Sequence, residues 1–289
     1  MSDKSSPQER AAVAEQPQRS APSWSRPVLL TAIVAAVLVL MANVWLVSRL
    51  VQQQANETQE HFFWMLCQPG YTPVERATAF TRLVAAGNRE WRSAELSDLN
   101  LRGISLQEAD LTRAGFNRAN LAKAVMARTV INRATLTLSD LTEADLTEAD
   151  LSETRCYRAV LIGAKLLRAN ARAAVLQEAR AERADFRMAD LSDADCLMAD
   201  LTGADFSGAN LTGVRLEGAI LRDTNLSLTR LENSNLKDAD FTNSNWWRAR
   251  GFTTAQLDVL KQKFAPSENA AAALKADYQK WAGGSGGER

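Results

Sequence analysis

The sequence predicts an all-β solenoid built from five-residue words, and two regularities carry this prediction. Every fifth residue from Leu96 to Trp246 is Leu, Phe, Ile, Met, Cys, Ala or Trp, without a slip of register across 31 words. Two positions earlier in each word the residue is Ala in 21 cases, so that a large and a small apolar side chain share one strand parity. The other three positions are mostly polar, and we expect them to face outward.

A five-residue period fits neither regular helix nor regular strand. On an α-helix, five steps of roughly 100° place successive leucines about 140° apart, so no face would be apolar. On a strand, residues five apart point to opposite faces. The leucines can share one interior only if a turn interrupts every word, which indicates a repeat architecture.

The words themselves resemble a known repeat. ADLTE, ADLTG, ANLTG and ADFSG are similar to the pentapeptide-repeat family, whose word is Ala-(Asp/Asn)-Leu-x-x, and the resemblance covers residues 94–248. It implies a right-handed quadrilateral β-helix with four words per coil, so that each residue lies beside the residue four words earlier. Ala171 and Ala181 replace the central Leu and thin the core, whereas Trp246 overfills the last coil.

The segments that flank the repeats differ from them in composition. Before the repeats we expect a disordered tail (1–27), a transmembrane helix (28–48), a juxtamembrane neck (49–71) and an N-terminal capping helix (72–93). The β-helix (94–252) is then followed by C-terminal helices (253–282) and a flexible tail (283–289).

The apolar segment at 28–47 carries no charge and matches a hydrocarbon core about 30 Å thick. A cleaved signal peptide usually has a shorter apolar region of roughly 7 to 15 residues, with a small-x-small cleavage site that is missing after this segment. We therefore expect a retained single-pass membrane anchor. Arg10, Arg19 and Arg26 precede it and Arg49 follows it, which places the N-terminus in the cytoplasm and the repeats on the extracytoplasmic side.

Capping signals predict helices at both ends of the solenoid. Thr72 and Glu75 form a capping-box pattern, and Gly87 is a stop signal. The apolar stripe of this helix would cover the first coil, because the ends of a solenoid need capping. Thr253 begins a second helix and a third follows Pro266. The C-terminal helices also offer a surface for a homodimer.

The sequence supplies no catalytic, cofactor-binding or metal-binding residues. His61 is the only histidine and has no Cys or carboxylate cluster at metal-ligand spacing. Cys156 and Cys196 are expected on one wall two coils apart, too far to form a disulfide, and Cys67 is left over. A net charge of zero does not suit a basic nucleic-acid binder. We expect a non-enzymatic protein without cofactors or nucleic acid.

The run SDLTEADLTEADLSE at 139–153 is the most acidic stretch. A calcium site needs oxygens that converge on one point, whereas consecutive words of a four-sided coil point about 90° apart. The spacing of four words per coil instead places each glutamate beside a base of the coil below. The predicted pairs are Glu143 with Lys123, Glu148 with Arg128, and Glu153 with Arg133.

Two candidate partner surfaces are left. One is an acidic band with little compensating charge on the coil below, although an Asp at the second position of a word also hydrogen-bonds its turn. It consists of Asp190, Asp193, Asp195, Asp200 and Asp205. The other is an outward apolar run on adjacent walls. It consists of Tyr157, Val160, Ile162 and Leu167.

Two functions from different classes follow. The first is a membrane-tethered, non-catalytic scaffold whose solenoid surface binds a protein of unknown identity. The second is suggested by the resemblance: some pentapeptide-repeat proteins mimic DNA and bind gyrase. Such mimicry requires a strongly acidic surface, but residues 94–248 hold 23 acidic and 19 basic residues, a net charge of only 23 − 19 = 4 negative units. The scaffold is therefore favoured.

Overall fold

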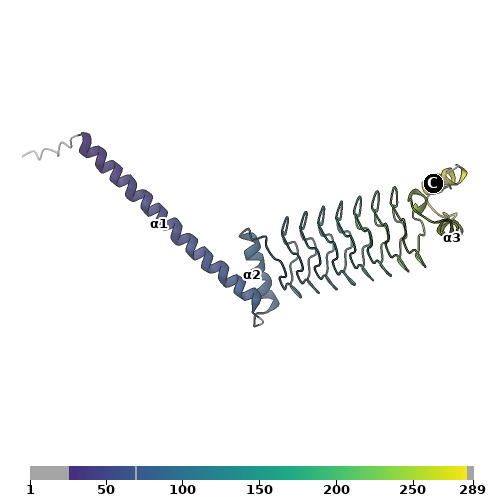
Figure 1. The fold of residues 1–289 in the computed structure, drawn as a ribbon, viewed down its shortest axis with the longest axis horizontal. Coiled ribbons are helices and arrows are strands. Elements are labelled where there is room, and N and C mark those ends of the chain that lie inside the picture. The colour runs from purple at the N-terminus through teal and green to yellow at the C-terminus, as the bar shows by residue number, and fades with distance from the viewer. Residues whose placement is uncertain (1–25, 69, 285–289) are drawn as a thin grey trace, which may run out of the picture. The chain divides into compact units, whose positions relative to one another are not determined.

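Residues 73–283 form a stack of coils with helices at both ends (Figure 1). The structure, a computed structural model, describes residues 26–68 and 70–284. Its helices are α1 (Arg26–Cys67), α2 (Pro73–Ala85), the short 3-10 helix η1 (Trp246–Arg248), α3 (Thr254–Phe264) and α4 (Ala272–Gly283). Most of the predicted N-terminal tail, at 1–25, and the end of the predicted C-terminal tail, at 285–289, lie outside the described residues.

One coil of the solenoid takes four words. Parallel β-bridges join residue n to residue n+20 in an unbroken register, from the pair Glu90–Asp110 to the pair Ile220–Asp240, with one more between Arg230 and Arg250. The four words of each coil therefore form four walls. We number the walls 1 to 4 from the bridges that begin at Glu90, Glu95, Asn100 and Ser105, and each corner takes the number of the wall before it.

The expected strands are the first of two parts of the fold class that need correction. Between 89 and 253 the described residues form isolated β-bridges of one residue each, and none of them belongs to a strand of two or more residues. The reason is geometric, because a turn in every word leaves only the residue before each central Leu in bridge geometry. The solenoid is thus β-like in its hydrogen bonding but holds little strand.

Backbone hydrogen bonds between coils hold the stack together, and each regular word makes three of them. In the word 139–143, the amides of Leu141, Glu143 and Asp140 donate to the carbonyls of Val160, Ile162 and Ala119, at 2.7, 2.9 and 3.0 Å. Two bonds reach the following coil and one reaches the preceding coil. The same pattern recurs from wall to wall along the solenoid.

The remaining two amides of a word explain its consensus. The amide of Ser139 closes the preceding turn on the carbonyl of Leu136 at 3.1 Å, and the amide of Thr142 donates to Oδ1 of Asp140 at 2.9 Å. An Asp or Asn at the second position therefore supplies the acceptor for the one amide that no backbone carbonyl reaches. With it, all five amides of the word are satisfied.

Every regular corner contains a residue with positive φ. Of these residues 25 are not glycine, and their φ angles lie between 53° and 64°. Gly203, Gly208, Gly213 and Gly218 take the same position at all four corners of one coil, with φ of 65–70°, as their five-residue spacing predicts. Left-handed backbone costs an L-residue about 1–3 kcal/mol, so the hydrogen bonds between coils must impose it.

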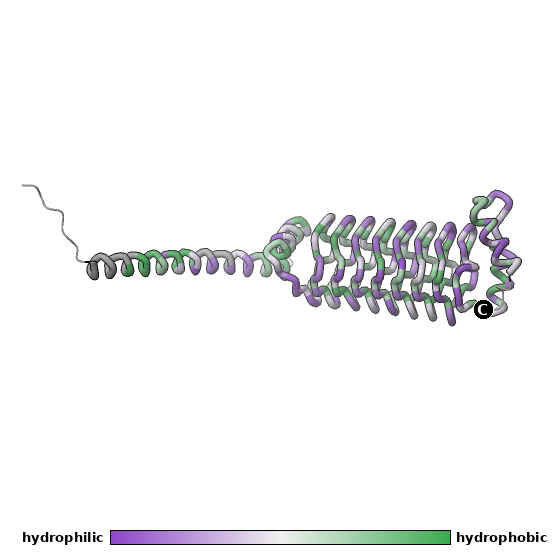
Figure 2. The backbone as a smooth tube through the Cα atoms, turned by 90° about the horizontal axis from the view of Figure 1, so that it is seen from above, coloured by the Kyte–Doolittle hydropathy of each residue, from purple (hydrophilic) through white to green (hydrophobic). Residues whose placement is uncertain are grey.

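The interior is filled by the central residues and by the small residues two positions earlier. Figure 2 shows apolar and polar residues alternating along each coil. Phe186 and Phe206 stack on wall 4 with ring centroids 4.9 Å apart and planes 3° apart. Where Ser or Thr replaces the small Ala, its hydroxyl bonds a backbone carbonyl, as Thr154 does to Leu151 at 2.6 Å.

The predicted transmembrane helix at 28–48 is wrong. Within the described residues, the helices contain no stretch that is long and apolar enough to cross a membrane. The segment is not an element of its own, because α1 runs for 42 residues and continues through the polar sequence QQQANETQE. The membrane anchor, the cytoplasmic N-terminus and the extracytoplasmic repeat domain are corrected with it.

The chain forms two compact units, Met1–Glu57 and Thr58–Arg289, and the second contains both caps of the solenoid. At its N-terminal end, α2 begins with a capping box in which Thr72 and Glu75 bond each other reciprocally. Phe80 of α2 and Phe63 both contact Trp91, at 4.6 and 5.6 Å between ring centroids. Trp91 is the central residue of a first word that precedes Leu96.

Aromatic rings and one carboxylate close the C-terminal end. Trp246 contacts Trp281 of α4 with ring centroids 5.3 Å apart. Asp277 accepts hydrogen bonds from Nε1 of Trp247 at 2.8 Å and from Nε of Arg248 at 2.7 Å. The bond from Arg248, followed by that from Trp247, lowers the pKa of Asp277. Residues that overfill the last coil therefore anchor α4.

The positive φ of the corners can be tested with an isomeric substitution. Leu138 has φ of 60° and a half-exposed side chain at corner 2. Replacing Leu138 with Ile adds β-branching and changes nothing else, so it should lower the free energy of unfolding by about 1–2 kcal/mol. Urea denaturation followed by circular dichroism measures this. Leu167→Ile, outside the corner position, should be close to neutral, and equal effects at both sites would contradict the argument.

The anchoring of α4 by Asp277 predicts a dependence on pH. The folded-state pKa of Asp277 lies below its unfolded value of about 3.9. The stability it contributes is therefore present above that value and is lost as pH falls through the folded-state pKa. The protection of the α4 amides against hydrogen exchange, relative to their intrinsic exchange rate at each pH, should fall in this acidic range. Asp277→Asn should lose this step, whereas Asp258→Asn on α3 should retain it.

Candidate interaction surfaces of the solenoid

The corners present the most exposed side chains, and equivalent corners of successive coils form columns along the solenoid. Two of the three predicted ion pairs are confirmed. Lys123 and Glu143 approach to 3.2 Å at corner 3, and Arg133 and Glu153 to 2.9 Å at corner 1. Exposed pairs of this kind contribute about 0.2–1 kcal/mol each.

The third predicted pair, Glu148 with Arg128, is wrong. Arg128 instead pairs with Glu108 at 2.6 Å, and Glu148 with Arg168 at 3.8 Å. These four residues alternate in sign along corner 4, so each inner side chain has an opposite charge on both neighbouring coils. The one-coil spacing identifies both neighbours but does not choose between them.

The acidic band is distributed around one coil instead of gathered on one face. Asp190, Asp195, Asp200 and Asp205 take the bridge position on walls 1, 2, 3 and 4. Each accepts a hydrogen bond from the amide two residues later, at 3.0, 3.1, 3.0 and 2.9 Å. These carboxylates cap their turns, and Oδ2 of Asp195 also accepts hydrogen bonds from Gln177 and Arg215, at 2.6 and 3.4 Å.

Asp193 differs from the other members of the band. It occupies corner 1 with φ of 59° and pairs with Arg172 at 3.5 Å. Its carboxylate leans toward the next coil, where a Cβ on Gly213 would lie 2.7 Å from Oδ1. The structure thus places Asp193 between walls 1 and 2, near Asp195 but far around the coil from Asp205.

The outward apolar run spans three walls. Tyr157 lies on wall 2, Val160 and Ile162 on wall 3, and Leu167 on wall 4, and all four are half-buried. The hydroxyl of Tyr157 donates to Glu178 at 3.0 Å, and this bond raises the pKa of Tyr157. The run lies in one layer of the solenoid but faces several directions.

A more exposed apolar feature lies on corner 4 and was missed by the sequence analysis. The column continues from the charged residues 108, 128, 148 and 168 to Met188, Gly208 and Leu228. Met188 is 58% exposed and Leu228 is 62% exposed. The Cγ atom of Met188 lies 3.7 Å from the position of a Cβ on Gly208. We call Met188, Gly208 and Leu228 the corner-4 strip.

The sequence does contain a signal for the strip, but the signal can be recognised only when residues 20 apart are compared. Met188 and Leu228 are two coils apart along the chain and look like isolated apolar residues in a polar stretch. They become neighbours of one glycine only when the chain is read one coil at a time and at the corner position. Reading single words hides this change from charge to apolar surface.

The described residues offer little for metal or nucleophilic chemistry. No group of three or more His, Cys, Asp or Glu side chains among them is placed to hold a metal ion. Burial raises the pKa of Cys156 to about 11 and that of Cys196 to about 12. Both thiols are therefore protonated at neutral pH, and they act as small core residues.

Comparison with known families identifies the repeat. The family model of pentapeptide repeats matches the chain in eight copies, over residues 94–133, 139–177, 172–208 and 209–245. These segments together span about half of the chain. Proteins of this family fold as right-handed quadrilateral β-helices, which agrees with the four words per coil seen here.

Several solved pentapeptide-repeat structures are similar to the chain. HetL, involved in heterocyst differentiation regulation in the cyanobacterium Nostoc, is 27% identical over 58% of this chain and 95% of its own, with a TM-score of 0.25. QnrB1, a plasmid-mediated fluoroquinolone resistance protein, is 16% identical over 61% and 90%, with a TM-score of 0.41.

A pentapeptide-repeat protein from the thylakoid lumen of Arabidopsis thaliana is 28% identical over 46% of this chain and 86% of its own, with a TM-score of 0.20. No curated protein sequence gives a significant match. With TM-scores this low, the family assignment rests on the repeat motif and not on these superpositions.

The turn-capping role of the acidic band can be separated from its charge. Asp200 accepts from the amide of Thr202 at 3.0 Å and from its hydroxyl at 2.6 Å. Asp200→Ala removes this acceptor and should lower the free energy of unfolding by about 1 kcal/mol. Asp200→Asn keeps the acceptor and should change it by less than about 0.5 kcal/mol. Equal losses in chemical denaturation would show that the charge matters more than the cap.

Proposed function

Because the chain belongs to the pentapeptide-repeat family, we propose that it is a non-catalytic scaffold that binds a partner protein through the surface of its solenoid. The observation that carries this proposal is the corner-4 strip. In a column whose first half is an ion-pair ladder, two large apolar side chains stand more than half exposed on either side of a glycine.

The local chemistry supports a protein contact at the strip. Gly208 carries no side chain, so a partner can approach the backbone between Met188 and Leu228. Met is flexible and polarisable, and it adapts to the shape of a bound surface. Exposed apolar groups rimmed by polar residues are typical of interaction sites.

The acidic band contributes to this surface in part. Asp190 follows Met188 by two residues on wall 1, and Asp205 precedes Gly208 by three residues on wall 4. Both carboxylates therefore flank the strip, while their capping bonds hold them in place. We infer that the partner presents an apolar element bordered by basic groups.

The other residues of the acidic band and of the apolar run lie away from the corner-4 strip and contribute less to the proposed contact. Asp195 and Asp200 lie on walls 2 and 3 and flank a second exposed methionine, Met198, at corner 2. The half-buried run that begins at Tyr157 stays a candidate contact. A homodimer through α3 and α4 also stays a prediction, and it would have to use the faces that do not pack on the last coil.

The gyrase-binding alternative lacks comparable support. A DNA mimic needs rows of uncompensated acidic groups, whereas the acidic stretch at 139–153 pairs with bases on neighbouring coils. The acidic band encircles the solenoid instead of following two lines along it. We therefore propose the general scaffold and not the mimic.

The proposal is tested by photo-crosslinking in lysate from the producing organism. A photoreactive residue in place of Leu228 should give a defined adduct, and Met188→Ser should weaken its formation by about tenfold. The weakening reflects the loss of a contact worth about 1.4 kcal/mol at the edge of the interface. Adducts are quantified by gel and identified by mass spectrometry.

The matched control is Leu138→Ser, because Leu138 is also an exposed apolar residue at positive φ, on corner 2. It should leave the Leu228 adduct unchanged. Asp190→Asn and Asp205→Asn keep their caps and should weaken binding through charge alone. The proposal is refuted if Leu228 gives no adduct above background, or if Leu138→Ser weakens the adduct as much as Met188→Ser.

A further inference from the structure

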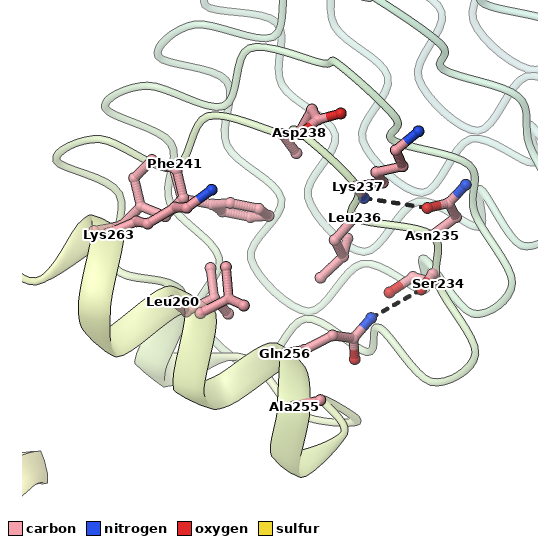
Figure 3. A pocket seen from close by; sticks show the side chains of 13 residues that line it. Ser234, Asn235, Leu236, Lys237, Asp238, Phe241, Ala255, Gln256, Leu260 and Lys263 are labelled. Carbon is pink, nitrogen blue, oxygen red and sulfur yellow. Dashed lines mark hydrogen bonds between the residues drawn. The ribbon is translucent and has the colours of Figure 1, made fainter.

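A cavity of about 430 Å³ lies between the last coil and α3, at the C-terminal end of wall 2 (Figure 3). The coil contributes residues 234–239 and Phe241, and α3 contributes one face that includes Gln256, Val259 and Leu260. This volume lies within the range of specific binding pockets. The cavity is separate from the corner-4 strip, and the inference drawn from it does not depend on that strip.

The preceding coil shows which backbone groups normally pair with this edge of a wall. On wall 2, the amides of Leu216 and Gly218 donate to the carbonyls of Asn235 and Lys237, at 2.8 and 2.9 Å, and the amide of Asn235 donates back to Val214 at 2.9 Å. Each wall therefore presents two donors and one acceptor to the next coil. A following chain fills them with two carbonyls, two residues apart, and one amide.

The last coil presents the same three groups with only one of them used. The equivalent acceptor is the carbonyl of Ser234, which receives Nε2 of Gln256 at 3.0 Å, drawn as a dashed line in Figure 3. The equivalent donors are the amides of Leu236 and Asp238. Neither amide has a hydrogen-bond partner among the described residues. Helix α3 therefore covers the edge while leaving its two donors open to the cavity.

The charges around the cavity favour an acidic occupant. Its lining includes Lys237, Lys263 and Asp238. Nζ of Lys237 forms an ion pair with Oε1 of Glu217 at 3.4 Å, whereas Lys263 has no ion-pair partner in the described part of the chain. Figure 3 shows Lys263 extending from α3 beside Phe241. Two open amide donors and an unpaired ammonium group together attract carbonyl and carboxylate oxygens.

The cavity also offers apolar contacts on its α3 side. Leu260 is buried, and Val259 is 47% exposed. An extended peptide places alternate side chains on opposite faces. One set could rest on Val259 and Leu260 while the other faces the lysines, which suits a segment in which acidic and apolar residues alternate.

We propose that the cavity binds an extended, acidic segment of a partner protein as one additional wall of the solenoid. Two of its carbonyls, two residues apart, accept hydrogen bonds from the amides of Leu236 and Asp238. An acidic side chain pairs with Lys263. This is β-augmentation, in which the main chain gives affinity and alternate side chains give specificity.

The opposite end of the solenoid does not offer the same arrangement. A cavity of about 440 Å³ lies between α2 and wall 4 of the first coil. There the carbonyl of Gln107 already accepts from the guanidinium of Arg89. The C-terminal edge combines free donors with an unpaired cation, so an acceptor-rich segment fits it better.

The test uses the full-length protein and a fluorescein-labelled hexapeptide, Glu-Val-Glu-Val-Glu-Val. Fluorescence polarisation should show saturable binding, and Lys263→Glu should weaken it by at least about tenfold. Val259→Trp should fill the cavity and abolish binding. Lys280→Glu on α4, outside the cavity lining, makes the same charge change and should bind as the unaltered protein does.

Amide exchange distinguishes edge pairing from simple charge attraction. Saturating peptide should slow exchange at Leu236 and Asp238, while Leu216 and Gly218, already bonded, should be unchanged. Four results would overturn the proposal: no binding, equal binding of Lys-Val-Lys-Val-Lys-Val, binding that survives Val259→Trp, or no protection of the two amides. Protection that rises with protein concentration without peptide would assign the edge to a second copy of this chain instead.

Discussion

The coil-to-coil backbone hydrogen bond is the interaction on which the rest of this structure depends. It fixes four words as the length of every coil, and it does so without reference to any particular side chain. Because the amides of the corner residues belong to this set of bonds, except for Asn233, Asp238 and Asn243 on the last coil, the same bonds also hold the other non-glycine corner residues in left-handed backbone that most of them would otherwise avoid. The small Ala and large Leu of each word then fill an interior whose dimensions the backbone has already set. Local strain and global register are therefore maintained by the same set of bonds.

This division of labour leaves the outer surface free to vary. A corner side chain contributes little to the ladder, so corner 4 can change from Glu and Arg to Met, Gly and Leu within one column without disturbing the stack. The second position of the word is less free, because its Asp or Asn caps the amide that the ladder does not reach. The acidic band illustrates the difference. Asp193, at a corner, is constrained by its ion pair, whereas Asp200 is constrained by its turn. A carboxylate count of the surface therefore overstates the charge that is available to a partner.

The period, the inward positions and the glycine corners could be predicted from sequence because each depends on the spacing of residues along the chain. Lys123 with Glu143 followed from the same arithmetic. The pairing of Arg128 did not, because two glutamates at equal spacing compete for it and side-chain conformation decides between them. The apolar segment before the repeats was assigned from length and hydropathy alone, and those do not reveal that the helix continues into polar sequence. The corner-4 strip was hidden because its residues are neighbours in a column and not in the chain. For the two candidate surfaces, the sequence indicated that the residues face outward. It did not indicate how these residues are distributed among the four walls.

The ends of a solenoid pose a different physical problem from its middle. Inside the stack each edge group meets its partner on the next coil, so the surface that remains is made of side chains. At the last coil the ladder stops, and a helix must cover groups that were spaced for an extended chain. A helix satisfies its own amides and carbonyls internally, so it can bring only side chains to such an edge, as Gln256 does for Ser234. One glutamine amide can donate to the open carbonyl, but a helix face has no row of acceptors with the spacing that Leu236 and Asp238 require. A helical cap therefore covers the apolar core more completely than it pairs the backbone groups at the edge of the last coil. Those groups keep the spacing that suits an extended chain.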